Sequence, residues 1–493
     1  MKILLAGYNL DSTVIEELKK SGPGRDDATP ETLSAAYARI SRDPRSVDKL
    51  REVARAEVEK ARRSNRNIIF KMGHHSVAEH AVFNFDVIGV SRLAMEEIEH
   101  FRLCSYTEKS QRYIKLGGDY LLPEEVKQAG KQDIFIETIQ TQNRLYHELY
   151  ELLKPFFWEK FSDLAEDPKY HALLDGWAKE DARYVLSLAT LGQLGMTLNA
   201  RNLEYMIRRF ATHPYAEIQD FNRNIYDLAK GVAPSILLFT EAGDFDMKTY
   251  PELGAFAENL AVPETPAAAD AVQLVDFTPD SDGKLLAALL HSVTSQPYQT
   301  CRDIAASLSP KDKKDLMMTA FQHMEFYDAV LREFEYVSLT FELVVSATCF
   351  AQLKRHRMST LATQSYNPEL GVVVPPSIQE VGAEPVFREI IEASEVCFDR
   401  LKSEMETGAE YILTNAHCKR VLWKVNAREF YHFSRLREDA SAQWDIRQVA
   451  ARMTELAKEV MPLTMLLVGG KDLYPEIYAS VFGRLPKSLP PES

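Results

Sequence analysis

Hydrophobic and polar positions along the chain predict the same short pattern, a buried strand followed by a helix, at two places. Residues 2–8 form an apolar run typical of a buried strand, and residues 272–277 form another. After the first run, Pro30–Glu31 opens a segment with apolar residues at helical spacing, for which Thr29 is the predicted N-cap. After the second run, residues 285–290 predict the corresponding helix.

Each half then continues with a second strand and with long helices. Residues 81–88 alternate between apolar and polar, and residues 337–345 are more uniformly apolar, so both ranges predict strands. Amphipathic helices are predicted in three further ranges: 131–153, 202–230 and 428–459. The predicted fold class is therefore α+β, with two tandem copies of an antiparallel sheet packed with long helices.

A short motif repeats between the halves and supports a division into two domains. The letters N-A-R at residues 199–201 recur at residues 426–428, and further arginines follow each copy. An internal repeat on this scale makes each half a domain-sized unit. Within the 493 residues we predict a first domain at 1–240, a proline- and alanine-rich linker at 241–270, and a second domain at 271–493.

The composition is that of an ordinary soluble protein with a surplus of acidic groups. The chain has 58 Lys and Arg against 72 Asp and Glu, which argues against nucleic-acid and membrane partners because phosphate affinity needs surplus cations. The five cysteines show no paired spacing, which favours reduced thiols over disulfides or a zinc site. No apolar run approaches the ~20 residues of a membrane span, and the N-terminus lacks signal-peptide features. A cytoplasmic location is therefore predicted.

A basic segment in the second half concentrates charge and hydrogen-bond donors at one point. Arg355, His356 and Arg357 suit the phosphates or polar ring edge of an anionic cofactor, although three basic residues alone are more often a solvated surface stripe. Ser365 follows after seven residues, and the stretch 426–444 lies downstream. The segment resembles the R-H-R signature of the flavin-dependent thymidylate synthases, and the downstream stretch resembles the second motif of that family.

The first half resembles the same family at other positions. Residues 73–80 are similar to the family's GH…EH segment, and residues 105–113 are similar to the loop that holds its uridylate. A hydroxyl, backbone amides and a guanidinium there would form an oxyanion cradle. Arg209 is the first-half counterpart of Arg437, which matches the family's arginine at the pyrimidine, although an ion pair on a helix surface explains Arg209 equally well. The resemblance implies that the substrate dUMP is bound by Ser105, Glu108, Ser110, Arg112, Arg183 and Arg209.

The resemblance also implies which residues serve the cofactor and catalysis. Arg437 matches the family's arginine at the pyrimidine and is assigned as catalytic together with Ser110. A role as helix N-cap explains Asn199 and Asn426 as well as contact with a ligand does. For His213, a place in a simple turn is an equally good explanation. The residues implied to bind FAD are Arg355, His356, Arg357, Asn426, Arg428, Asn199, Arg201 and His213.

The reaction implied by the resemblance is the reductive methylation of dUMP to dTMP. The family uses reduced flavin, with methylenetetrahydrofolate as carbon donor and NADPH as reductant, and needs no cysteine nucleophile or metal. Two alternatives stay open. One is a relic that binds flavin or nucleotide without turnover and has a regulatory or scaffolding role, and the other is a flavin enzyme that acts on another pyrimidine nucleotide.

Each half departs from the family pattern at a different place. Residues 100–102 read His-Phe-Arg, without the first arginine and the histidine of the signature, and the second-half loop at 360–367 lacks the glutamate and arginine. Members of the family resemble one another in being homotetramers with sites between subunits. We therefore predict composite sites, with Arg355–Arg357 facing the loop at 105–113, in a homodimer that forms a pseudo-tetramer.

Overall fold

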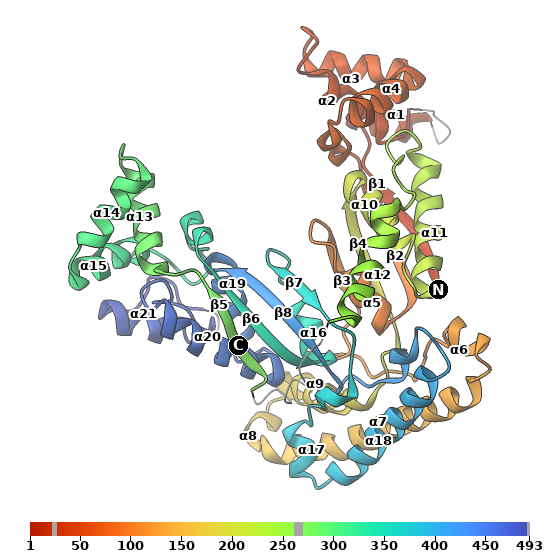
Figure 1. Ribbon diagram of the computed structural model, residues 1–493, viewed down its shortest axis with the longest axis vertical. Coiled ribbons are helices and arrows are strands. Elements are labelled where there is room, and N and C mark those ends of the chain that lie inside the picture. Colours follow the sequence, from red (N-terminus) through yellow and green to blue (C-terminus); the bar gives the residue numbers. More distant parts are fainter. Residues whose placement is uncertain (22–26, 261–269, 491–493) are drawn as a thin grey trace. The chain divides into compact units, whose positions relative to one another are not determined.

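The computed structural model describes residues 1–21, 27–260 and 270–490 (Figure 1). The chain divides into two compact units, and each takes in one segment from the opposite half of the sequence. The first unit comprises Met1–Lys179, Leu186–Glu264 and Arg388–Leu413, and the second comprises Glu180–Val185, Thr265–Phe387 and Thr414–Ser493. The predicted boundaries at residues 240 and 271 concern the two repeats in the sequence, and as domain boundaries they stay a prediction.

A four-stranded antiparallel sheet in the order β1-β2-β4-β3 forms the first unit's centre. Its strands are β1 (Lys2–Tyr8), β2 (Val82–Ser91), β3 (Ser105–Glu108) and β4 (Leu191–Asn199). The helices of the first half are α1 (Ser12–Ser21), α2 (Glu31–Arg39), α3 (Val47–Ala56), α4 (Val58–Asn65), α5 (Arg92–Ile98), α6 (Glu124–Gln128), α7 (Gln132–Lys160), α8 (Ser162–Ala165), α9 (His171–Ala182), α10 (Ala200–Phe210), α11 (Ala216–Val232) and α12 (Asp244–Glu258).

Side chains alternate across the first sheet and so define its buried face. Along β2, Phe83 and Phe85 are buried while Asn84 and Asp86 between and beyond them are exposed, as expected for a strand with one covered face. The buried side chains belong to one hydrophobic cluster with apolar residues of α10 and α11, such as Ile207. The sheet therefore holds α10, which follows β4 directly, in a fixed position.

The second unit repeats this plan with a four-stranded antiparallel sheet in the order β5-β6-β8-β7. Its strands are β5 (Val272–Phe277), β6 (Ser338–Ser346), β7 (Thr360–Thr363) and β8 (Cys418–Asn426). The helices of the second half are α13 (Ser281–Val293), α14 (Tyr298–Ser307), α15 (Pro310–Phe321), α16 (Ala347–Leu353), α17 (Pro376–Glu380), α18 (Glu384–Lys402), α19 (Ala427–Arg437), α20 (Trp444–Val460) and α21 (Tyr474–Phe482).

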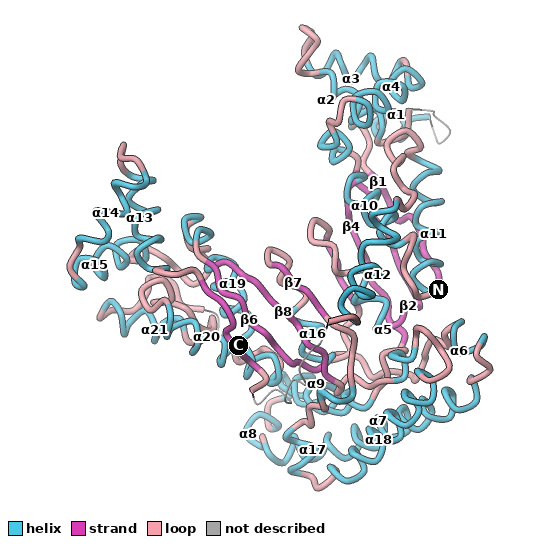
Figure 2. The backbone as a smooth tube through the Cα atoms, viewed as in Figure 1, coloured by secondary structure: helices cyan, strands magenta, loops and turns pink. Residues whose placement is uncertain are grey.

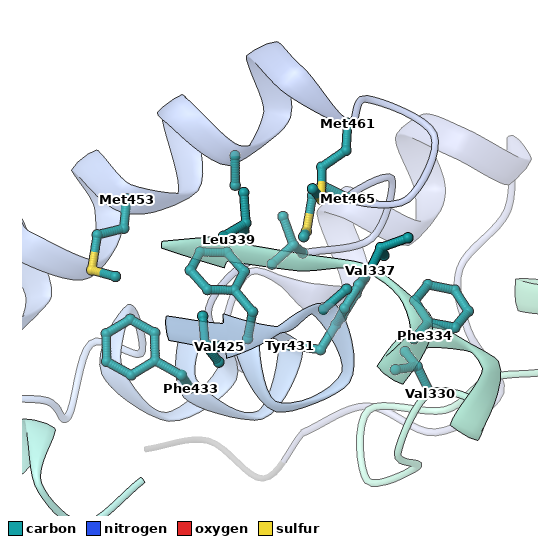
Figure 3. Close-up of a cluster of buried hydrophobic side chains, with 14 of the residues drawn as sticks. Val330, Phe334, Val337, Leu339, Val425, Tyr431, Phe433, Met453, Met461 and Met465 are labelled. Carbon is teal, nitrogen blue, oxygen red and sulfur yellow. The ribbon is translucent and has the colours of Figure 1, made fainter. Parts of the chain in front are cut away.

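The core of the second unit lies between its sheet and helices α19 and α20. Figure 3 shows Leu339 of β6 and Val425 of β8 among Phe433 of α19 and Met453 of α20. All four side chains are buried. Because β8 leads straight into α19, packing of this core also fixes the direction in which α19 leaves the sheet.

The predicted fold class is confirmed, since both units combine an antiparallel sheet with long helices (Figure 2). The strands predicted at residues 2–8 and 272–277 are β1 and β5, and the two second strands are β2 and β6. The predicted burial of residues 2–8 is wrong, because β1 is an edge strand with no fully buried side chain. The sequence reasoning did not propose β4 and its counterpart β8, which lie at the interior of each sheet.

Two of the predicted long helices are each two helices. Residues 202–230 contain α10 and α11, which are separated at Pro214, because proline lacks an N–H and restricts the residue before it. Residues 428–459 contain α19 and α20, and there the side chain of Gln443 accepts from two backbone N–H groups at the start of α20. The prediction at 131–153 is confirmed as part of α7.

The predicted N-cap and linker also differ in detail from the structure. Pro30, not Thr29, occupies the N-cap position of α2, although the Thr29 hydroxyl accepts from the Glu31 N–H at 3.2 Å. The predicted linker at 241–270 contains α12, and its residues 261–269 lie outside the described part of the chain. Within the described ranges, no helix is both long and apolar enough to cross a membrane.

The segment that each unit takes from the opposite half is anchored by a buried tyrosine. In the first unit, the Tyr411 hydroxyl donates to Glu217 Oε2 at 2.9 Å, and Ser91, the N-cap of α5, donates to the same oxygen at 2.6 Å. In the second unit, the Tyr184 hydroxyl donates to Asp445 Oδ2 at 2.9 Å, and the hydroxyl of the N-cap of α16 donates to it at 2.6 Å. The two anchors are the same chemical arrangement, built once in each unit.

We expect each anchor to stabilise its unit measurably. Tyr411→Phe or Tyr184→Phe removes one donor from a buried carboxylate, which should lower the free energy of unfolding by about 1–3 kcal/mol. Urea unfolding followed by tryptophan fluorescence measures this change. Tyr327→Phe, at a 65% exposed position, is the control and should leave the unfolding curve in place. A Tyr411→Phe curve that overlays the wild-type curve would contradict the prediction.

Asp181, which lies in the exchanged segment of the second unit, should make stability depend on pH. Burial raises the pKa of Asp181 to about 7, although the Ser377 hydroxyl and the Trp444 indole N–H both donate to its carboxyl group. The folded state therefore keeps a proton that the unfolded state loses near pH 4. The contribution of Asp181 to stability should be greatest below about pH 4, fall by up to about 4 kcal/mol as the pH rises to 7, and then level off.

Melting temperatures measured between pH 4 and 8 check this dependence. Asp181→Asn keeps a neutral group at the position, so the difference in melting temperature between wild type and variant should shrink or reverse toward pH 7. A difference that is constant across this range would show that Asp181 does not titrate there.

Candidate functional site

The basic segment of the second half lies in a tight loop between α16 and β7. The Ser359 hydroxyl donates to the His356 carbonyl oxygen at 2.6 Å, and the Trp423 indole N–H donates to Ser359 Oγ at 2.6 Å. Trp423 is fully buried on the neighbouring strand β8. The loop that carries His356 is therefore tied to the centre of the sheet.

The buried His356 pairs with the half-buried Arg437 in this unit. The Arg437 Nε–H donates to His356 Nε2 at 2.9 Å, and His356 is only 2% exposed. Because a guanidinium donates but never accepts, His356 Nε2 must be unprotonated. Burial, together with the charges of Arg437 and Arg355 and the nearby His432, holds the pKa of His356 well below its usual range. The imidazole is neutral, and it fixes the direction of the guanidinium.

In the first unit, two aromatic residues occupy the positions that correspond to His356 and Arg437. Both α10 and α19 follow a capping asparagine and contain 11 residues, so Arg437 at the end of α19 corresponds to Phe210 at the end of α10. Phe101 takes the place of His356 in the basic segment. The rings of Phe101 and Phe210 lie 5.3 Å apart, edge to face. A hydrogen-bonded pair in one unit is an aromatic pair in the other.

The predicted nucleotide loop of the first half begins as an edge strand. Residues 105–108 form β3, which pairs with β4, and its Glu108 carboxylate lies 3.7 Å from the buried Arg92. Beyond the strand, Ser110 Oγ accepts from the Arg112 N–H at 3.1 Å and closes a turn. Ser110 and Arg112 are partly exposed. The loop is therefore folded around Ser110 and remains accessible from solvent.

A cavity of about 220 Å³ lies beside this loop within the first unit. Its lining is mixed, with amide, ammonium and thioether groups, and includes Lys109, Gln111, Lys115, Gln193, Gly192 and Met95. The sequence reasoning assigned no role to these residues, because each is of an ordinary type at a position that carries no motif letter. Only the folding of the loop against β2 and β4 brings them together.

The comparisons with known proteins bear on what these sites do. A family model described as "Thymidylate synthase complementing protein" matches residues 26–235 and 273–463. The chain belongs to this family. The two matched regions correspond to the two repeats, and the predicted resemblance is confirmed.

Relatives of the chain fall into two kinds. A "UPF0159 protein" from Chlamydia muridarum is 24% identical over 425 residues, which cover 82% of this chain and 79% of that protein. A "Flavin-dependent thymidylate synthase" from Clostridium tetani is 30% identical over 214 residues, which cover 43% of this chain and 82% of that protein. A solved flavin-dependent thymidylate synthase from Helicobacter pylori, complexed with FAD and dUMP, covers 49% of this chain and 100% of its own, at 16% identity and a TM-score of 0.32. That low score supports no structural argument.

The asparagines of the thymidylate synthase complementing protein motif cap helices in both units. Asn199 Oδ1 accepts from the Asn202 N–H at 3.0 Å, and Asn426 Oδ1 accepts from the Glu429 N–H at 2.9 Å. The N-cap interpretation is therefore confirmed for both. Their contact with a flavin stays a prediction.

The other motif residues proposed for the flavin differ in their surroundings. Arg201 pairs with Glu79 at 2.5 Å, and Arg428 donates to the Val330 carbonyl oxygen at 3.1 Å. Arg355 is exposed and Arg357 is partly exposed. Arg201 and Arg428 thus have identified structural partners, and Arg355 and Arg357 are accessible from solvent.

His213 and Arg209 have structural roles in the first unit. His213 Nδ1 accepts from the Tyr215 N–H at 3.2 Å within the turn after α10, as the turn interpretation expects. Arg209 pairs with Asp246 of α12 at 3.2 Å, so the surface ion pair is also confirmed. The proposed correspondence of Arg209 with Arg437 is wrong, because the helix register gives that position to Phe210.

Arg183 was grouped with the nucleotide loop in the sequence, but it lies in the second unit. There it is buried, and its carbonyl oxygen accepts from Asn415 Nδ2 at 3.0 Å. Glu410, at the matching position of the second half, lies in the first unit. The exchange of segments therefore includes both of these charged residues.

Substitution of a capping asparagine should separate its two possible roles. Asn426→Ala should lower the free energy of unfolding by about 1 kcal/mol, whereas Asn426→Ser keeps a capping oxygen and should cost little. Urea unfolding measures stability, and flavin absorbance of the purified protein measures cofactor content. An Asn426→Ser chain that is stable but has lost flavin would show that the asparagine contacts the cofactor directly.

Proposed function

We propose that this chain is a flavin-dependent thymidylate synthase that methylates dUMP to dTMP, with FAD as cofactor, methylenetetrahydrofolate as carbon donor and NADPH as reductant. Its membership of the thymidylate synthase complementing protein family supports the reaction class. The observation that carries the proposal is the hydrogen bond between the half-buried Arg437 guanidinium and the buried His356 imidazole. A guanidinium held in this way against a neutral imidazole loses part of its hydration, whereas Phe101 and Phe210 fill the same positions in the first unit with an apolar contact.

The residues around His356 fit an anionic dinucleotide cofactor. Arg355 and Arg357 flank the buried imidazole and are accessible from solvent, so their guanidinium groups would hold FAD phosphates. His356 itself would bound the pocket rather than carry charge, because it is neutral. When bound, the flavin supplies the redox chemistry that no side chain of this protein can provide.

Arg437 would serve the pyrimidine. Its guanidinium is permanently charged, and the hydrogen bond to His356 Nε2 holds it in one orientation. A preoriented cation stabilises negative charge that develops on a pyrimidine ring without having to reorganise during the reaction. Ser110 and Arg112 of the first half would bind the phosphate of the nucleotide, since the turn that the Arg112 N–H closes on Ser110 Oγ keeps a hydroxyl-bearing and a guanidinium-bearing residue next to each other.

We further propose that each active site combines nucleotide contacts from first-half loops with cofactor contacts from second-half loops, in a homodimer. The support is the division of residues. The first half retains Ser110 and Arg112 but has Phe101 at the histidine position of the basic segment, whereas the second half retains that histidine but lacks the glutamate and arginine of the loop. A cytoplasmic location is part of the same proposal.

Turnover tests the proposal directly. Purified protein with FAD, dUMP, methylenetetrahydrofolate and NADPH should oxidise NADPH and release dTMP, and its absorbance should give one flavin per chain. Arg437→Ala should lower kcat/KM by about 10²–10³-fold, as expected for loss of a charge-stabilising group. Arg452→Ala, which removes an exposed arginine paired with Glu455, is the control and should retain activity. Binding of flavin and dUMP without any dTMP would identify the chain as the inactive relic.

The composite arrangement has its own test. Arg112→Ala alters only the first-half loop and Arg355→Ala alters only the second-half loop, yet each should remove nearly all dTMP synthesis. Stability measurements on both variants control for misfolding. If either variant keeps about half of the wild-type activity at saturating dUMP, the two halves work as independent sites.

A further inference from the structure

The Glu429 side chain lies next to the His356–Arg437 pair. It occupies the first turn of α19, where Asn426 caps its backbone N–H. Its carboxylate is only 12% exposed, and Oε1 lies 3.5 Å from His356 Nδ1. The imidazole therefore has a guanidinium at one nitrogen and a carboxylate near the other.

The protonation of the two ring nitrogens follows from this arrangement. Since Nε2 accepts from Arg437, the proton of the neutral ring must be on Nδ1. Nδ1 is buried and makes no hydrogen bond of normal length within the described residues. At 3.5 Å, the nearest carboxylate oxygen is a few tenths of an ångström beyond that length. A small closure of this gap would give the proton an acceptor.

Burial outweighs the surrounding charges at Glu429, so the pKa of its carboxyl group lies above its usual range. Burial raises the pKa of its carboxyl group, but His432, Arg428 and Arg357 all act in the opposite direction. His432 also lies against His356, with ring centroids 5.7 Å apart. The His356 ring thus lies close to both the Glu429 carboxyl group and the His432 ring.

The first unit provides an internal comparison. Asn202 of α10 corresponds to Glu429, since both are the third residue of their helices and both have an N–H capped by the asparagine of the N-A-R motif. Phe101 and Phe210 take the places of His356 and Arg437 there. The carboxylate is therefore present where the histidine–arginine pair is present and absent where the pair is aromatic. The three positions differ together.

We propose that Glu429 is a positioning residue that holds the proton of His356 on Nδ1, so that Nε2 remains the acceptor that orients Arg437. Carboxylates commonly fix the tautomer of a functional histidine in this way through its second nitrogen. The role of Arg437 at the pyrimidine rests on the proposed function. The control of the His356 tautomer by Glu429 does not.

The tautomer can be read without substrate or flavin. Long-range ¹H–¹⁵N correlation spectra of the full chain labelled with ¹⁵N-histidine distinguish the two neutral tautomers, and His356→Gln assigns the signals. In the wild type, His356 should show a protonated Nδ1 and a bare Nε2. In Glu429→Ala the pattern should shift to a mixture of tautomers, whereas Glu429→Gln, whose amide oxygen still accepts, should restore the wild-type pattern.

Glu325→Ala is the matched control. It removes another buried carboxylate of the second unit, one that accepts from the Ser488 N–H at 2.8 Å, and it should leave the His356 signals unchanged. Histidine signals elsewhere in the Glu429→Ala spectrum should stay in place and so show that the variant is folded. An unaltered His356 pattern in folded Glu429→Ala would overturn the proposal.

Kinetics then test the consequence for Arg437. Glu429→Ala should lower kcat about 10–100-fold, as is usual for loss of a group that orients a site residue, with flavin content unchanged. Glu429→Gln should recover most of the rate. A changed tautomer with full kcat would overturn the link to Arg437. If the wild type forms no dTMP at all, the proposed function fails, yet the spectra still decide whether Glu429 sets the tautomer.

Discussion

The folded chain depends on the burial of one tyrosine hydroxyl against a carboxylate in each unit. Tyr411 donates to Glu217 and Tyr184 donates to Asp445, and in both cases a helix-capping serine donates to the same oxygen. Leaving such a carboxylate without its donors inside a protein is expensive. Because each tyrosine comes from the opposite half of the sequence, each buried carboxylate takes one of its donors from the other half.

The two units share their backbone frame but differ in the side chains that the frame holds together. The sheets, the capping asparagines and the tyrosine anchors are present in both units, so the frame on which α10 and α19 are held is the same. On that frame, one unit packs Phe101 against Phe210 and the other pairs His356 with Arg437. The aromatic pair needs no polar partner. The polar pair does, and the carboxylate of Glu429 lies where it could supply one.

Most features that depend on residues close together in the sequence were predicted correctly, whereas features that depend on distant residues were not. Strands with clear apolar runs, such as residues 2–8, were predicted at their observed bounds, and both capping asparagines were recognised as possible caps. The prediction of one continuous helix in each of the ranges 202–230 and 428–459 was wrong, because the helical spacing of the apolar residues does not reveal the short breaks after α10 and α19. Arg209 was matched to Arg437 by letter, and only the equal length of the two helices showed that Phe210 holds that position.

By itself, the sequence determined the fold class and the family, since these follow from local periodicity and from motif letters within a few residues. The tertiary structure alone decided which distant residues work together. His356 and Arg437 are 81 positions apart and Tyr411 and Glu217 are 194 apart, so no local pattern can pair them. The physical reason is that a buried polar group is stable only with a partner. Which partner it finds is settled by the packing of distant elements.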